Sequence, residues 1–224
     1  MRTVKMLLAF ALIAALAVPA FGQRTPGSFS IGGFGGLAMP QSPKEFKDLA
    51  KSSIGYGGEF KYNINEKTSF VAAFSMLPFK YNEDEFTKMF EEFTGETGLE
   101  VNVEGGGFKI NAITGNVLLY LSPPEASTGF YATVGGGYYM LKTEDPDKVE
   151  VTVEGETIDV TDEFTSNGES EGENKFGVNG GLGLEVAMGT NLALFAEGKY
   201  HLIFTEDDKT GFITVMGGIR FSLQ

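Results

Sequence analysis

Residues 54–63 read IGYGGEFKYN, and this stretch decides how the rest of the chain is interpreted. Its large apolar and aromatic residues fall on alternate positions, and Glu59, Lys61 and Asn63 occupy positions between them. A repeat of two residues is the side-chain period of a β-strand. We therefore predict a strand here with one apolar face and one polar face.

Seven other stretches are extended in the same way, and in most of them an apolar face opposes Gly, small or charged residues. The eight expected strands are residues 28–39, 54–63, 68–79, 108–121, 129–141, 175–188, 191–203 and 211–223. An even number of strands, joined alternately by short and long connections, is what a closed outer-membrane barrel requires. The predicted fold class is all-β: an eight-stranded antiparallel up-and-down transmembrane β-barrel with short periplasmic turns and long outer loops.

Two of these stretches are less regular than the others. Phe34 is out of phase within residues 28–39, and residues 108–121 can be read with either face outward. A β-bulge within 108–121 would account for that ambiguity. The facing of this strand is therefore left open.

The apolar faces can point inward or outward. Inward, they would make a soluble lipocalin-like barrel that binds an apolar ligand. Outward, they would contact lipid, and aromatic residues near the strand ends would form the girdles of a membrane barrel. Those aromatic residues are Tyr56, Phe60, Tyr62, Tyr120, Phe130, Tyr138, Tyr200, Phe204, Phe212 and Phe221. The aromatic positions and the alternating connections favour the outward arrangement.

With the apolar faces outward, a polar set of residues lines the lumen. This set is Glu59, Lys61, Asn179, Glu185, Glu197, Lys199, His201 and Arg220. Its role is either structural, as an internal network of ion pairs, or the selection of ions. An eight-stranded interior is just filled by its side chains, so we expect Glu59 or Glu197 to pair with Lys61, Lys199 or Arg220.

Residues 1–22 have the layout of a cleavable secretory signal peptide. Arg2 and Lys5 precede the apolar residues 6–18, and small residues then allow cleavage after Ala20 or Gly22. The apolar run is shorter than the roughly 20 residues that a membrane-spanning helix needs. We expect residues 23–224 to form the barrel domain, located in the bacterial outer membrane.

The charge balance is acidic. Arg2 and Lys5 lie in the predicted signal, so 15 of the 17 Lys and Arg residues remain beside 30 Asp and Glu residues. Most of the acids lie in residues 82–106 and 143–173, two long connections that would repel nucleic-acid phosphates. The chain has no Cys and no calcium-loop pattern. We therefore expect no cofactor, no metal site and no nucleic-acid partner.

Two of the outer loops carry helix signals. Ser42, Pro43 and Glu45 fit the N-cap, first and third positions of a short helix that reaches Leu49. A second helix should begin at Asn82, and its apolar face is Phe86, Met89, Phe90 and Phe93. We expect that face to pack on the barrel rim or mouth; the alternative is a patch that engages a partner or outer-leaflet lipid.

A third loop alternates on both sides of Glu154 and Gly155. This pattern predicts a β-hairpin over residues 148–160 that stands above the membrane. We expect it to continue the fifth and sixth strands of the barrel.

The chain resembles the small bacterial outer-membrane β-barrels of the OmpA/OmpX/OmpW type. The resemblance lies in the signal, the eight strands, the Gly-rich residues 129–139 and 176–185, and the last strand. Residues 218–224 look like the C-terminal signal of the barrel-assembly machinery, with Gly218, Phe221 and Leu223 at its positions. Gln224 replaces the usual terminal aromatic residue, and Met216 stands where a polar residue is commoner. The resemblance implies outer-membrane lipid, lipopolysaccharide and the assembly machinery as partners.

Three functions are open to such a barrel. The first is a non-enzymatic structural or surface-interaction role through the acidic outer loops, with an unidentified surface partner. The second is a narrow pore or small-molecule channel. The third, an enzyme, would depend on His201, the single histidine, which has no Ser two residues away; a G-x-S-x-G motif is also missing. We therefore expect no catalytic residues.

Overall fold

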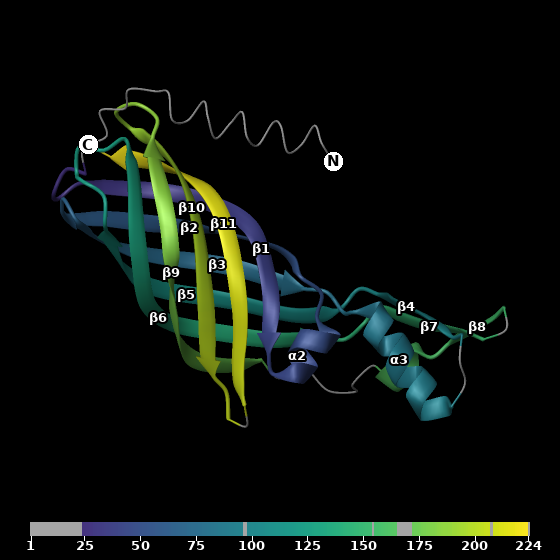
Figure 1. Ribbon diagram of the computed structural model, residues 1–224. Helices are drawn as coiled ribbons and strands as arrows, with labels where there is room; N and C mark the ends of the chain where they lie inside the picture. Colours follow the sequence, from purple (N-terminus) through teal and green to yellow (C-terminus); the bar gives the residue numbers. More distant parts are fainter. Residues whose placement is uncertain (1–23, 96–97, 154, 165–171, 207, 224) are drawn as a thin grey trace.

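The computed structural model describes residues 24–95, 98–153, 155–164, 172–206 and 208–223. Within these residues, eight strands close into an antiparallel barrel in the order β1-β11-β10-β9-β6-β5-β3-β2 (Figure 1). Their bounds are β1 Phe29–Ser42, β2 Ser53–Asn65, β3 Thr68–Phe79, β5 Gly107–Tyr120, β6 Thr128–Glu144, β9 Glu173–Ala187, β10 Leu192–Phe204 and β11 Lys209–Leu223. The predicted fold is confirmed, because each expected strand is present.

The two faces of the barrel wall have the predicted polarity. On β2, Ile54 is 69% exposed on the outside, whereas Lys61 is 3% exposed inside. On β11, Val215 faces outward and Arg220 is buried inside. The apolar surface is therefore on the lipid side, and the soluble lipocalin-like alternative is wrong.

The strand at residues 108–121 is resolved without a bulge. Ile110 and Leu118 are buried inside the barrel, and Ile113 and Leu119 are exposed on its outer face. Its register with β3 and β6 is continuous. The sequence was ambiguous because Ile110 and Leu118 each pack in an apolar cluster inside the lumen, so this strand needs apolar residues on both faces.

Phe34 keeps the period of β1 and points into the lumen, where it packs against the apolar interior. Its ring centroid is 6.5 Å from that of Phe195. Gly57, on the neighbouring strand, leaves the space it needs, since a Cβ there would lie 2.5 Å from Phe34 Cζ. The apparent phase error is thus an inward aromatic residue opposite a glycine.

Two of the expected girdle residues also point inward. Tyr120 and Phe212 are 4% and 0% exposed, and both pack inside the barrel. Tyr56, Phe130 and Phe204 do lie on the outer face, more than 45% exposed. A Tyr or Phe near a strand end is therefore not by itself an outward residue, because the lumen of this barrel also takes aromatic rings.

The short connections and both described ends of the chain lie at one end of the barrel, the periplasmic end. Phe29 pairs with Leu223 there, at the start of β1 and the end of β11. The long connections lie at the opposite end, which is the outer end. None of the helices in the described residues has both the length and the apolar character that crossing a membrane demands.

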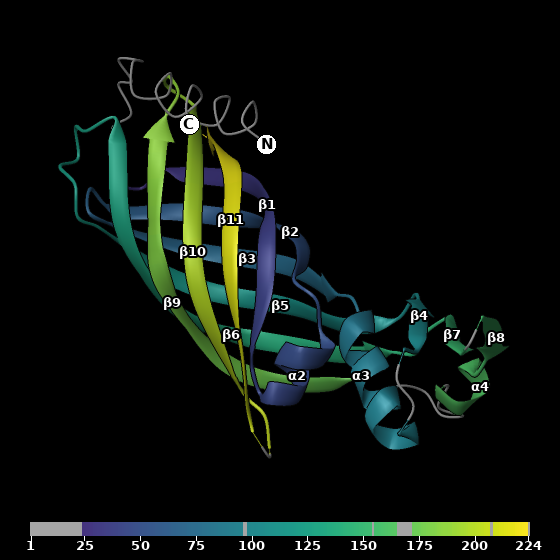
Figure 2. The same ribbon diagram turned by 45° about the vertical axis from the view of Figure 1, so that its right-hand side comes forward.

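The outer connections build a small unit beyond the barrel, which we call the outer subdomain (Figures 1 and 2). It consists of α3 Glu83–Thr94, β4 Glu100–Glu104, β7 Lys148–Val153, β8 Glu156–Asp159 and α4 Thr161–Phe164. The hairpin β7–β8 is present, but it does not continue the barrel strands. It forms a separate sheet in the order β4-β7-β8, and β4 was not predicted.

The β4 strand was missed because it lies in an acidic stretch that resembles a solvated loop. Acidic or polar residues alternate in it with two buried valines, Val101 and Val103, which pack on Val149 and Val151 of β7. That contact is between segments far apart in the chain. The sheet therefore exists through tertiary packing rather than through a local strand signal.

Helix α2 spans Lys44–Leu49 and ends where expected, but its predicted cap is wrong. Pro43 is the N-cap residue, and the helix has no side-chain cap hydrogen bond. Ser42 instead belongs to β1, and its Oγ donates to the carbonyl of Lys209 at 3.2 Å. Strand β1 extends further than expected, and Ser42 is therefore its last residue rather than the cap of α2.

Helix α3 begins after Asn82 as predicted, without the side-chain cap bond. Asn82 Nδ2 donates to the carbonyl of Asp48 at 2.9 Å, which ties α3 to the end of α2. Its amide therefore joins two outer helices instead of capping its own.

The apolar face of α3 packs on the outer sheet, not on the barrel rim. Phe86 and Phe90 lie against the valine cluster of β4 and β7, and Met89 is 53% exposed. The side chain of Phe93 lies outside the described part of the structure. Tyr81 joins the subdomain to the rim, because its ring is 5.4 Å from those of both Phe86 and Phe108.

Candidate functional site

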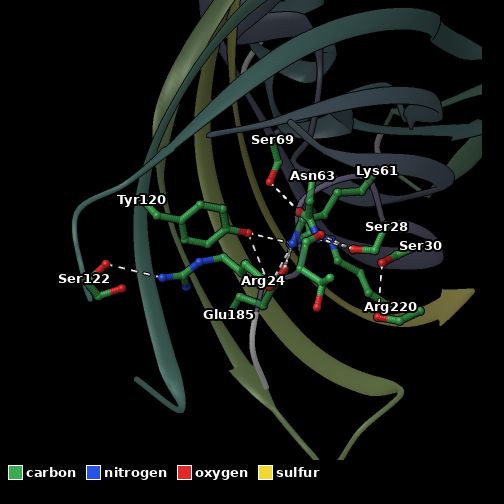
Figure 3. Close-up of polar contacts among 12 residues, drawn as sticks. Arg24, Ser28, Ser30, Lys61, Asn63, Ser69, Tyr120, Ser122, Glu185 and Arg220 are labelled. Atoms are coloured by element: carbon green, nitrogen blue, oxygen red, sulfur yellow. Dashed lines mark hydrogen bonds and ion pairs between the residues drawn. The ribbon is translucent and has the colours of Figure 1, made fainter. Parts of the chain in front are cut away.

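Four charged side chains meet inside the barrel towards its periplasmic end. They are Glu59 and Lys61 of β2, Glu185 of β9 and Arg220 of β11, and we call them the charge quartet. Figure 3 shows Lys61, Glu185 and Arg220 of this set. The two-residue period of each strand directs them inward. Lys61 and Arg220 are 3% and 2% exposed.

Glu185 is the centre of the quartet. Lys61 Nζ lies 2.8 Å from each of its carboxylate oxygens, and Arg220 Nη1 lies 2.5 Å from Oε2. Arg220 also donates through Nε and Nη2 to Glu59. Two cations and two carboxylates thus cancel, which is the condition for holding buried charge at an acceptable cost.

Aromatic rings support the quartet. The Tyr120 hydroxyl accepts from Lys61 Nζ at 2.7 Å and donates to Glu185 Oε1 at 3.2 Å. The Arg220 guanidinium carbon lies 3.8 Å from the centroid of Phe195, a cation–π contact. Tyr120 and Phe195 were not among the predicted lumen residues, although their inward phase follows from the strand period.

The structure places the other predicted lumen residues further along the interior. Lys199 Nζ lies 2.7 Å from Glu197 Oε1, two residues earlier on β10, and both side chains are largely buried. Of the pairs expected, Glu59–Arg220 and Glu197–Lys199 are present. Lys61 pairs with Glu185 across the lumen rather than with Glu59 or Glu197.

His201 is buried in a local hydrogen-bond network. Its Nδ1 is 3.0 Å from the Tyr139 hydroxyl, and its Nε2 is 3.1 Å from Thr214 Oγ1. The imidazole also stacks on Phe212, with centroids 4.5 Å apart. Asn179 Nδ2 donates to the same Tyr139 hydroxyl at 3.5 Å. Both ring nitrogens are occupied, and no Ser–His–carboxylate set is present among the described residues.

The outer half of the lumen is filled by apolar side chains, which we call the apolar plug. Its members are Ala38, Phe46, Ala50, Leu77, Phe79, Ile110, Ala112, Tyr139, Ile203, Phe212 and Met216. Phe46 belongs to α2, and its ring meets those of Phe79 and Phe108 at centroid distances of 5.2 and 5.7 Å. Helix α2 thereby covers the outer mouth. The sequence did not predict this plug.

A cavity of about 630 Å³, partly open to solvent and lined by both polar and apolar residues, occupies the periplasmic end. Lys61, Glu185 and Arg220 of the quartet line it, together with Ser30 and Ser222. We call this cavity the polar chamber. The interior therefore has the chamber at its periplasmic end and the apolar plug at its outer end, and a second apolar cluster of Val71, Leu118, Tyr120 and Tyr131 packs beside the quartet.

The residues of the predicted assembly signal lie on the last strand. Phe221 and Leu223 are each 47% exposed on the lipid face. Gly218 faces inward, where a Cβ would come within 2.6 Å of the Phe195 ring. Gly218 therefore has a packing role in the barrel, separate from the proposed role as a recognition residue. Gln224 lies outside the described residues.

Among the described residues, no group of three or more His, Asp and Glu side chains is arranged to hold a metal ion. The acidic residues of the outer subdomain are spread over its surface, and several pair with lysines. Lys88 contacts Glu85 and Lys148 contacts Glu150, at 2.5 and 2.7 Å.

Residues 8–221 match the family described as the outer membrane protein beta-barrel domain. The chain belongs to this family, and its location is the outer membrane. A search of curated proteins found no match.

Solved structures agree with the fold. The N-terminal β-barrel domain of Pseudomonas aeruginosa OprF is 14% identical, with a TM-score of 0.51, over 88% of this chain and 98% of that one. A major outer membrane protein of Thermus thermophilus is 9% identical, also with a TM-score of 0.51, over 89% and 100% of the two chains. At these identities the similarity concerns the fold alone.

Proposed function

We propose that this protein is a non-conducting, non-enzymatic outer-membrane barrel that acts at the cell surface through its acidic outer subdomain. The observation that carries the proposal is the apolar plug. Phe79, Tyr139 and Phe212 are each no more than 1% exposed, so the outer half of the lumen is packed like a protein core.

The plug opposes ion conduction for a physical reason. An ion that crosses it must lose its hydration shell between aromatic and aliphatic side chains that offer no replacement charge, which is costly. Phe46 adds a second barrier, because α2 holds it over Phe79 at the outer mouth. The charge quartet then serves the barrel as an internal crosslink between its walls.

The surface role rests on the charge of the outer loops. Residues 82–106 contain eight acidic residues beside Lys88, and residues 143–173 contain twelve beside Lys148. Such a surface attracts a partner that presents positive charge and accelerates its association. Outer-membrane lipid, lipopolysaccharide and the barrel-assembly machinery are the further partners we propose.

The absence of an enzymatic role is supported by the surroundings of His201. Tyr139 and Thr214 form hydrogen bonds with its two ring nitrogens, and Phe212 stacks on one face of the ring. The imidazole lies next to the apolar plug, where packed side chains leave no room for a substrate.

A narrow pore is the second candidate, and the polar chamber favours it. The chamber and the quartet would form the periplasmic half of an ion path. Conduction would then require Phe46, Phe79 and Phe212 to move away from the outer half.

Single-channel recording of the folded protein in a planar bilayer tests the proposal, with the heat-dependent gel shift as the control for folding. We expect no openings. A triple variant with Phe46, Phe79 and Phe212 changed to Ala should conduct if it folds, since it removes the barrier. Steady openings of the unaltered protein that change ion preference in Lys61→Met or Arg220→Met would contradict the proposal and establish a pore.

The surface role has its own test. Bacteria that produce the protein should adhere to a polylysine-coated surface more strongly than to a neutral one. Replacing Glu91, Glu92, Glu100 and Glu104 by Gln should reduce that difference, whereas Glu66→Gln in a periplasmic turn should not. Equal adhesion by both variants would exclude the outer subdomain as the binding surface.

A further inference from the structure

The chain segment before β1 does not leave the barrel directly. Residues 25–28 read Thr-Pro-Gly-Ser, with Gly27 at φ 81° and the amide of Ser28 3.2 Å from the carbonyl of Thr25. Pro followed by a Gly of positive φ is the signature of a type II turn. The turn reverses the chain, so that Arg24 points back under the barrel.

The turn is fastened to the β2 strand. The Gly27 amide donates to the carbonyl of Asn63 at 2.7 Å, and the Asn63 amide donates to the carbonyl of Ser28 at 3.0 Å. Asn63 Nδ2 also donates to Ser28 Oγ at 2.9 Å. Ser69 of β3 extends this network, because its hydroxyl donates to Asn63 Oδ1 at 2.6 Å.

Arg24 spans the periplasmic mouth (Figure 3). Its Nε donates to the carbonyl of Glu66 in the β2–β3 turn at 2.9 Å. Its Nη2 donates to the carbonyls of Pro123 at 2.8 Å and Ser122 at 3.3 Å, in the β5–β6 turn. One guanidinium therefore joins the start of β1 to two other periplasmic turns, and Arg24 is only 6% exposed.

The same guanidinium is coupled to the charge quartet. Its carbon lies 4.1 Å from the ring centroid of Tyr120, whose hydroxyl contacts Lys61 and Glu185. Residues 24–28 also line the polar chamber, together with Lys61, Glu185 and Arg220 of the quartet. They therefore form part of its wall at the periplasmic mouth.

We propose that residues 24–28 are a strap that narrows the periplasmic mouth and limits entry to the polar chamber. Arg24 is its latch, because its guanidinium makes the hydrogen bonds that hold the strap, and the turn at Gly27 directs Arg24 towards them. When these bonds break, the path from the periplasm to the chamber widens. This inference concerns the periplasmic end and is independent of any role of the outer subdomain.

Cysteine accessibility tests the strap, since the chain has no cysteine of its own. Ser30 lines the chamber and is 4% exposed, so Ser30→Cys reports entry. The protein is purified from outer membranes as the cell processes it, and the rate of modification by the small anionic thiol reagent MTSES is measured. Ala38→Cys, buried in the apolar plug at the outer end, is the control position.

We expect Arg24→Ala to raise the rate at Ser30→Cys about tenfold or more, because three hydrogen bonds from a charged donor are lost. Arg24→Lys should give an intermediate rate, since an ammonium lacks the planar fork that reaches both turns. Gly27→Ala should raise the rate about fivefold while keeping Arg24, because a Cβ there meets no atom within 4 Å and only the positive φ is strained. The heat-dependent gel shift shows that each variant is folded.

Rates at Ser30→Cys that agree within about twofold in the Arg24→Ala, Gly27→Ala and unaltered backgrounds would overturn the strap. An equal rise at Ala38→Cys would overturn it too, because the variants would then loosen the whole barrel. A rise confined to Ser30→Cys supports it.

Discussion

Lys61 Nζ lies 2.8 Å from both carboxylate oxygens of Glu185, although the two residues are 124 positions apart in the chain. Their strands, β2 and β9, lie on opposite sides of the ring of eight. The contact therefore crosses the lumen. It joins two strands of the barrel wall that share no backbone hydrogen bonds. Loss of this contact is therefore the subject of the first prediction.

Glu185→Gln should destabilise the barrel by about 3–5 kcal/mol, because Lys61 and Arg220 would keep their charges with only Glu59 to balance them. The free energy of unfolding by urea in lipid vesicles measures the effect. Adding Lys61→Met to Glu185→Gln should restore most of the stability, since the Glu59–Arg220 pair is then neutral by itself. Glu206→Gln, whose side chain is 85% exposed, should change nothing. An unchanged Glu185→Gln variant would show that the quartet is not an energetic crosslink.

Two glycines of β9 should respond differently to the same substitution. A Cβ at Gly183 would lie 2.5 Å from the Tyr131 hydroxyl, whereas a Cβ at Gly180, on the lipid face, meets nothing closer than 3.5 Å. We expect Gly183→Ala to cost about 1–3 kcal/mol through overpacking, and Gly180→Ala to stay within about 0.5 kcal/mol. The same urea titration compares them. If Tyr131→Leu fails to relieve the loss in Gly183→Ala, the explanation by the Tyr131 ring is incorrect.

His201→Ala should behave as the loss of a packed lumen residue. It removes the contacts with Tyr139 and Thr214 and the stacked ring on Phe212, so we expect a loss of about 3 kcal/mol. Hydrolysis of ester, phosphate and peptide substrates should be equal in the variant and the unaltered protein, at the level of empty membranes. Hydrolysis that disappears with His201 while the gel shift remains normal would establish an enzyme.

The turn after β8 should depend on pH. Hydrogen bonds from the side chain and backbone of Thr161 lower the pKa of Asp159 below its usual value. The folded carboxylate is the favoured form, so the turn is stabilised above the ordinary Asp pKa and loses this contribution as pH falls through the lowered pKa. The amide resonance of Thr161 should follow that titration in NMR spectra. Asp159→Asn should abolish the pH dependence, and a Thr161 resonance that titrates unchanged in Asp159→Asn would assign it to another group.

The sequence was sufficient for the architecture because the signals are local. A strand buried in lipid on one face and filled on the other must alternate, so the positions of Ile54, Lys61 and Arg220 relative to the wall follow from the two-residue period. The same period places Tyr120, Phe195 and Phe212 inside. The aromatic character of Tyr120 and Phe212 instead favours the membrane interface, and the period is the stronger of the two signals.

The outer part was less predictable for a different reason. The strand β4 and the face of α3 are held by contacts between separate loops, and acidic residues mask their alternation. The latch at Arg24 has no sequence pattern, because it depends on where two distant turns place their carbonyls.

The sequence by itself thus determined the number of barrel strands, the facing of all but residues 108–121 and the membrane that surrounds them, since each of these depends on residues close together in the chain. Only the tertiary structure decided which charges meet, where the lumen becomes apolar and what closes its two ends. These features depend on the register of the eight strands, which decides which residues of different strands lie at the same height along the barrel axis. The register is fixed only when the ring of strands closes, so it cannot be read from any single strand.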